Sequence, residues 1–89
     1  MRAIITVIGK DRVGIISGVS QVLAAHGVNI LDISQTILQD MFTMMMMVDL
    51  QESTVDFTAL SEQLDKEGRG LGVEIRIQRE DIFESMHRI

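Results

Sequence analysis

Residues 9–14 form a glycine-flanked polar turn, Gly-Lys-Asp-Arg-Val-Gly, between an apolar segment and a segment with helical spacing. A helix that begins at this turn presents unpaired backbone N–H groups and the positive end of its dipole, which suit a carboxylate or another anion. Asp11 lies beside these donors, and Asn29 reaches them if the following strand returns alongside the first. Carboxylate and amide groups bind the ammonium and the remaining polar atoms of a zwitterion. The spacing therefore predicts a small-molecule sensor rather than a catalyst.

Other chemistries lack the residues that they need. The two glycines of the turn have the spacing of a phosphate-binding loop, but Ile15-Ile16 follows where such a loop carries Lys and Ser or Thr. The chain has no cysteine and only two histidines, far apart, so no spacing is typical of a metal site. No Ser-His-Asp pattern is present, and the acidic residues flank or lie on a solvated helix. We therefore expect no metal, no cofactor and no enzymatic activity.

The composition indicates one small domain, residues 1–89. The chain carries a formal net charge of −5 and scattered basic residues, whereas nucleic-acid binding needs clustered Lys and Arg. No apolar run is long enough to span a membrane, and the N-terminus lacks the apolar region of a signal peptide. We therefore expect a cytoplasmic protein that binds neither nucleic acid nor membranes.

The hydrophobic periodicity predicts the order β-α-β-β-α-β followed by a helical tail. The expected strands are residues 2–8, 28–39, 41–50 and 73–78, with a tight turn at 39–40. The expected helices are residues 13–26, a second helix capped by Ser53 or Thr54 and ended by the glycine-rich segment 68–72, and a tail at 81–89. Right-handed crossovers then place the first and third strands at the centre of a four-stranded antiparallel sheet. The prediction is a ferredoxin-like α+β sandwich with both helices on one face and its core in residues 2–80.

The face of the sheet without helices is expected to carry methionines. Alternation along residues 41–50 places Met45 and Met47 on the face opposite to Met44 and Met46. Neighbouring methionines therefore cannot converge on a copper ion, and packing is the better explanation of the run. Few monomers leave such an apolar area open to water. We expect a second subunit or the terminal helix to cover it.

The element order, together with Gly-Lys-Asp-Arg-Val-Gly-Ile-Ile after the first strand and Gly-Val-Asn-Ile at the second, resembles the ACT domain family. The resemblance covers about residues 2–80. It is closest to the free-standing single-domain bacterial members, which are also similar over residues 80–83 and 86–89, and looser to the glycine cleavage repressor group. It implies a ferredoxin-like regulatory module that binds an amino acid at an interface between paired domains.

The resemblance also assigns roles to single residues. Gly14 matches a turn glycine that lets a ligand or backbone approach, Asp11 matches a ligand-contacting position, and Asn29 matches the Asn that opens the second strand. Many members have proline in place of Val13, and serine-binding members have His in place of Gly9, which argues against serine. The candidate ligand-binding residues are Asp11, Arg12, Val13, Gly14, Ile15, Asn29 and Ile30. Asp11 as a helix cap and Asn29 as a turn-former remain structural alternatives.

Three functions are compatible with the element order and these residues. In the first, an amino acid or similar small zwitterion binds a homo-oligomer and regulates a separate metabolic enzyme or regulator. The homo-oligomer is most simply a dimer, paired through a sheet edge or through the methionine-rich face. The second is a constitutive assembly module without a small ligand. The third is an enzyme with the element order of acylphosphatase, in which Arg12 would bind phosphate. Because Asp11 would repel that phosphate, the first two hypotheses are favoured.

Overall fold

The computed structural model describes residues 1–86 of the chain. The elements are β1 (Arg2–Lys10), α1 (Ile15–Ala25), β2 (Asn29–Leu38), β3 (Met41–Asp49), α2 (Phe57–Leu71), β4 (Val73–Arg79) and α3 (Glu80–Met86). The predicted βαββαβ order with a helical tail is confirmed. The part of the tail prediction that concerns residues 87–89 lies outside the described residues.

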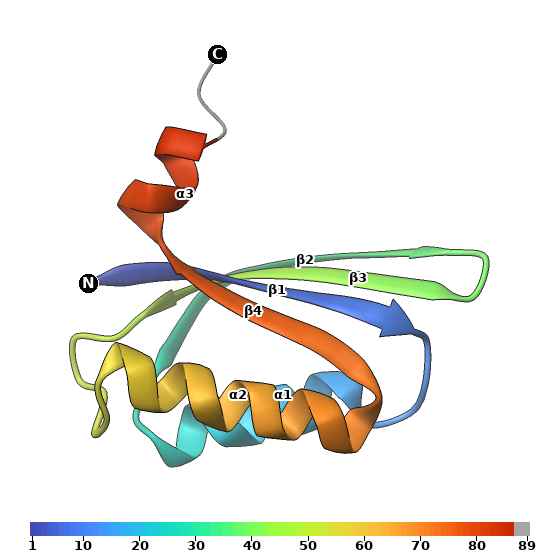
Figure 1. Ribbon diagram of the computed structural model, residues 1–89, viewed down its shortest axis with the longest axis horizontal. Helices are drawn as coiled ribbons and strands as arrows, with labels where there is room; N and C mark the ends of the chain where they lie inside the picture. Colours follow the sequence, from blue (N-terminus) through green and yellow to red (C-terminus); the bar gives the residue numbers. More distant parts are fainter. Residues whose placement is uncertain (87–89) are drawn as a thin grey trace.

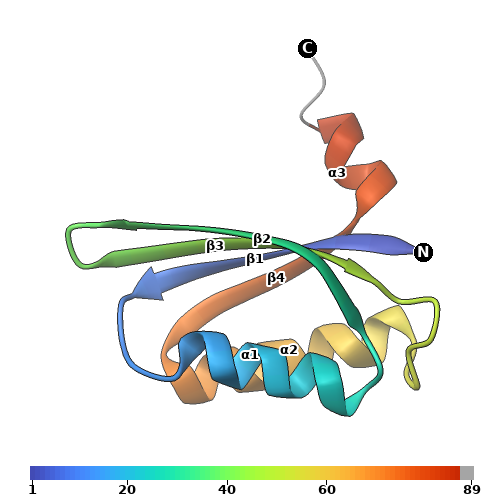
Figure 2. The ribbon, with the colours of Figure 1, turned by 180° about the vertical axis from the view of Figure 1, so that it is seen from behind.

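The four strands form one antiparallel sheet in the order β2-β3-β1-β4, so the first and third strands are central, as predicted. Helices α1 and α2 lie together on one face of this sheet, and α3 rises from the opposite face (Figures 1 and 2). The closed end of the β2–β3 hairpin extends past both helices in the two views. The fold is therefore the expected sandwich, with part of its sheet uncovered on both sides.

The core lies between the helices and the two central strands. Side chains that alternate along β1 and β3 meet the apolar stripes of α1 and α2, and each large one that is fully buried contributes about 1.5–3 kcal/mol. The largest completely buried residues are Ile5, Val7, Ile15, Val19, Leu23, Met44, Met46, Val48, Leu60 and Leu64. This core fixes the positions of the two loops from which the candidate site is built.

Strand β1 continues through Gly9, where the sequence predicted a break. Gly9 is paired with Phe42 on β3 and with Val73 on β4. A Cβ at Gly9 would lie 2.7 Å from the Val73 Cγ1 atom, so glycine is required here by close packing rather than by a turn. The strand consequently extends to Lys10, and α1 begins at Ile15 rather than at residue 13.

Both ends of α2 differ from the prediction. The cap is neither Ser53 nor Thr54 but Asp56, whose carboxylate accepts a hydrogen bond of 2.8 Å from the Ala59 N–H. The helix also continues through most of the glycine-rich segment and ends only at Gly72, which has a φ of 74°. Tertiary packing outweighs the low helix propensity of the earlier glycines.

Strand β2 is a long exposed edge with a bulge. The register with β3 shifts between Ile30 and Asp32, so Leu31 is the additional residue. Beyond the bulge the predicted alternation is confirmed, because Ile33 pairs with Met46 and Ile37 pairs with Phe42 on the helix-bearing face. Every residue from 31 to 38 is nevertheless exposed, since the hairpin extends beyond the helices (Figure 1).

Candidate ligand-binding site

The β1–α1 turn is held against the β2–β3 hairpin. The Asp11 N–H donates a hydrogen bond of 2.8 Å to the Asp40 carbonyl at the tip of the hairpin. Gly14 is the N-cap of α1 with a φ of 96°, and no side chain caps this helix. The interpretation of Asp11 as a helix cap is therefore wrong. Because no side chain caps the helix, the first N–H groups of α1 can bind an anion.

Gly14 is needed for the backbone conformation of the turn. Its positive φ is strained for any residue with a side chain. A Cβ at Gly14 would have no heavy atom of the chain within 4 Å apart from its immediate neighbours, so the space beside the helix start is open. This geometry permits a ligand to approach the N-terminus of α1.

A hollow of about 460 Å³ lies between this turn and the helix-bearing side of the hairpin. Its polar lining includes Asp11, Ser17 and Gln35, and its apolar wall includes Ile16 and Ile37. Pockets of this size suit small molecules. Sequence reasoning missed Gln35, although its position between Ile33 and Ile37 on an otherwise apolar face was a signal for it.

The other predicted residues of the turn have different roles. Arg12 lines the hollow, but its Nη1 donates a hydrogen bond of 2.8 Å to the Leu71 carbonyl at the end of α2. Val13 is fully exposed and does not line the hollow. Ile15 lines it but is buried in the core, so only a small part of this residue is accessible. The turn is thus anchored by Arg12 and open at Asp11 and Gly14.

The structure does not bring Asn29 to this turn within one chain. Asn29 and Arg2 both lie level with Asp49 on β3, whereas the turn follows Lys10 at the other end of β1. From Arg2 to Lys10, β1 rises about 26 Å at about 3.3 Å per residue. The predicted convergence in a single chain is therefore wrong, because α1 runs back along the sheet before β2 begins.

Asn29 lines a second hollow instead. This hollow has a volume of about 490 Å³ and lies beside the C-terminal end of α1, where Asp49, Gln51 and Glu52 also line it. Ile30, the other predicted residue of this segment, is half-buried and packs against the core. The sequence-predicted site residues are consequently divided between the two ends of the sheet.

Comparisons with known proteins identify the family of the chain. The family model of the ACT domain matches residues 2–78. The chain belongs to the ACT domain family. A UPF0237 protein of Clostridium acetobutylicum is 60% identical to it over 89 residues, which cover 100% of both chains. The solved structure of an ACT domain protein from Streptococcus pneumoniae matches with a TM-score of 0.83 and 51% identity, over 94% of each chain.

A candidate glycine cleavage system transcriptional repressor of known structure is also similar. It matches with a TM-score of 0.76 and 25% identity, over 86% of this chain and 44% of that one. The predicted family and the ferredoxin-like fold are confirmed by these matches. No helix within residues 1–86 is both long and apolar enough to cross a membrane, and the same residues contain no cluster of three or more His, Cys, Asp or Glu placed to hold a metal ion.

We expect Arg12→Ala to lower the free energy of unfolding by about 1 kcal/mol, because it removes a charge-assisted hydrogen bond from an exposed site. Arg69→Ala is the matched control, since it removes only an exposed ion pair with Asp65 on α2 and should cost about 0.3–0.5 kcal/mol. Urea unfolding of the three proteins measures both changes. An Arg12 variant as stable as the wild type would mean that this anchor is not formed in solution.

Proposed function

We propose that this ACT domain is a non-catalytic regulatory module that binds a free amino acid between two copies of the chain. The proposal rests on one geometric relation, which is that the two halves of the predicted site lie at opposite ends of an exposed edge strand. Two such strands that pair antiparallel about a two-fold axis bring opposite ends together. Each half then meets its complement on the other chain.

The exposed edge is suited to this pairing. Between residues 29 and 38, Asp32 is the only charged side chain, so this edge lacks the lysines and prolines that usually prevent strand addition. If the two-fold axis passes near Ile33, Asn29 of one chain lies level with the partner's Thr36, because the bulge shortens this half of the strand by one step. Thr36 adjoins Ile37, which lines the hollow of about 460 Å³. Ile33, which is 42% exposed, would be covered by the same contact.

Each part of an amino acid has a partner in this arrangement. The ligand carboxylate accepts hydrogen bonds from the uncapped N–H groups at the start of α1. The carboxylate of Asp11 binds the ammonium group, and the amide of Asn29 from the other chain completes the polar contacts. The apolar wall at Ile16 and Ile37 accommodates the ligand side chain. The site therefore exists only in the pair, and the ligand stabilises the pair.

Regulation follows from this dependence on pairing. A ligand that binds the paired form and not the separate chains shifts the equilibrium between them by its differential affinity. We propose that a separate enzyme or regulator in the cytoplasm distinguishes the two forms. The similarity to a candidate transcriptional repressor supports a regulatory role.

Thermal melting in the presence of each of the twenty amino acids at millimolar concentration tests the proposal. We expect one amino acid, or one chemical class of them, to raise the melting temperature, because a ligand at 100 times its Kd adds about 2.7 kcal/mol of stability. Isothermal calorimetry should then show one site per chain. If no amino acid has an effect while the chains remain paired, the chain is a constitutive assembly module.

A further inference from the structure

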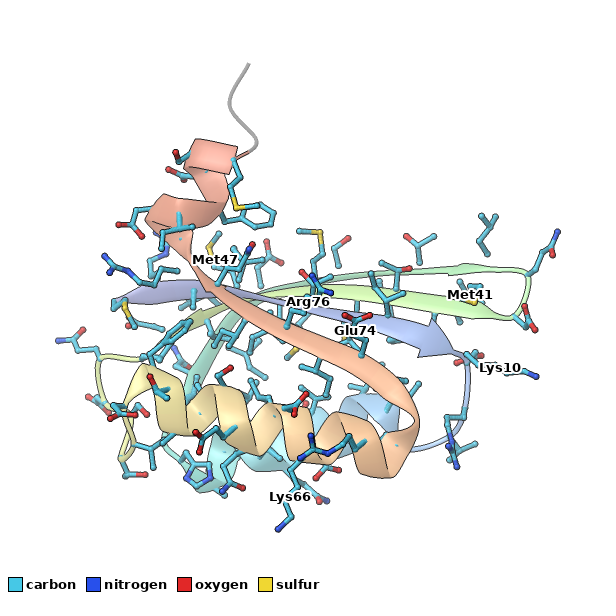
Figure 3. All side chains as sticks on the ribbon, viewed as in Figure 1. Lys10, Met41, Met47, Lys66, Glu74 and Arg76 are labelled. Atoms are coloured by element: carbon cyan, nitrogen blue, oxygen red, sulfur yellow. The ribbon has the colours of Figure 1, made fainter. Side chains whose placement is uncertain are left out.

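The face of the sheet opposite to α1 and α2 is open except at one end, where Ile4 is only 7% exposed. We call the part of this face formed by β1 and β3 the Met face, which consists of Ile4, Thr6, Ile8, Thr43, Met45 and Met47. Met47 lies on the same side of the sheet as α3 (Figure 3). Met45, on the central strand β3, is 38% exposed. The Met face therefore presents apolar groups to water at the middle of the sheet.

Helix α3 contacts β1 and β4 at one end of the sheet and leaves the rest of the Met face open. It rises away from the sheet instead of lying along it (Figures 1 and 2). Ile82 and Met86 on this helix are 47% and 63% exposed. A hollow of about 390 Å³ lies between the helix and the sheet, where Ile8, Phe83 and Met86 are among the lining residues. The structure thus leaves two apolar surfaces, one on the sheet and one on α3, that share a corner.

We propose that a second copy of the chain covers the Met face, sheet against sheet, with the α3 helices enclosing the edges of the contact. The spacing favours this occupant. Stacked sheets pack about 10 Å apart, and a helix of the length of α3 (Glu80–Met86) is about 10.5 Å long at about 1.5 Å per residue. Each α3 is therefore as tall as the gap between two stacked sheets.

A stable pair would use the whole open face of the sheet, including β2 and β4 on either side of the Met face. Four strands about 4.8 Å apart and about 26 Å long give a projected area of about 500 Å². The uneven surface of the side chains and the exposed side of α3 add to this projected area. The buried area then approaches the roughly 800 Å² per partner of a standard interface. A contact restricted to a single strand or to α3 alone would be too small.

The charges beside the Met face favour a neutral occupant. Arg2 forms an ion pair of 2.7 Å with Glu80 on α3, and Arg76 donates to Glu74 at 2.6 Å on β4. Figure 3 shows Glu74 and Arg76 side by side. Because these charges are already paired within the chain, covering the sheet leaves none of the four without a partner. The register also places Lys10 and Asp32 on this face, one charge of each sign. A surface with balanced charges matches a second copy of itself better than a strongly charged protein does.

This contact is compatible with the pairing of β2 edges. Strand β4, which leads into α3, is the edge opposite to β2 in the sheet. Pairing through β2 therefore leaves α3 on the outer side and places the two Met faces on the same side of one continuous sheet. Two such pairs then stack face to face, and the complete assembly contains four chains.

Sedimentation equilibrium of single-residue variants tests the Met face. We expect wild-type protein to have the mass of four chains and Met45→Glu to have the mass of two, because burying the new carboxylate weakens the contact about 100-fold or more. Ile8→Glu, on the neighbouring strand of the same face, should have the same effect. The matched control is Thr58→Glu, an exposed position on α2 on the other side of the sheet, which should leave the mass unchanged.

A third variant separates this proposal from the proposed function. Ile33→Lys should break the β2 pairing and leave a two-chain species held by the Met face. A single-chain mass for Ile33→Lys overturns the Met-face proposal, whether or not the two Glu variants fold. A wild-type mass of two chains that Met45→Glu leaves unchanged also overturns it, while pairing through β2 and amino-acid binding would still stand.

Discussion

Mixing Asp11→Ala chains with Asn29→Ala chains restores amino-acid binding to about a quarter of the sites, although each variant alone binds none. The reason is that each site takes Asp11 from one chain and Asn29 from the other. In a mixed pair, one site carries both substitutions and the other site carries neither. Random exchange of chains makes half of all pairs mixed, and half of the sites in those pairs are intact.

Calorimetry of the separate variants and of their equimolar mixture measures this stoichiometry. The ligand is the amino acid identified with wild-type protein, and the mixture is first diluted and reconcentrated so that the chains exchange. The affinity of the restored sites should equal that of the wild type. A mixture of Asp11→Ala with Gly14→Ala is the matched control, because both substitutions are in the same turn and no intact site can arise. Restoration in that control, or none in the first mixture, contradicts a site shared between chains.

Ile33→Lys is expected to weaken the β2 pairing about 100-fold and to abolish ligand binding with it. Near a two-fold axis, the substituted lysines of two chains face each other, and the apolar contact between the isoleucines is lost. Ligand binding is lost because Asn29 no longer reaches the partner's turn. Sedimentation measures the pairing and calorimetry measures the ligand.

Thr58→Lys supplies the same charge on α2, away from both proposed interfaces, and should change neither measurement. The Ile33→Lys protein should also keep its melting temperature within a few degrees at low concentration, since the position is exposed in the single chain. If this variant still binds the amino acid, the edge strand is not the interface that forms the site. The ligand would then have to be held by one chain alone.

The fold was predictable from the sequence because its signals are local. Alternation in β3 and the apolar stripes of the two helices identify the elements, and the known handedness of crossovers then fixes the order of the strands. The errors have tertiary causes. Gly9 looks like a turn residue but is needed where Val73 packs against the strand. The choice of Asp56 as a cap depends on where the loop before α2 meets the core.

The candidate site was only partly predictable for a different reason. The turn from Asp11 to Gly14 is contiguous in sequence, so its proximity to a helix start could be inferred. The distance between this turn and Asn29 depends on the length and direction of α1, and the relation between two chains depends on an interface that no single sequence segment encodes. Gln35 was missed because its role appears only when the hairpin lies over the turn.

The bulged edge strand has a practical consequence for handling the protein. In a lone chain, residues 31–38 display an unpaired row of backbone donors and acceptors, with only Asp32 to discourage foreign peptides from adding to it. Pairing of two chains through β2 covers this exposed strand edge. Dilution separates the chains and exposes the edge again, whereas a high protein concentration keeps it covered. Slow precipitation or cross-β seeding is therefore to be expected in weak stocks stored without ligand, and concentrated stocks should keep better.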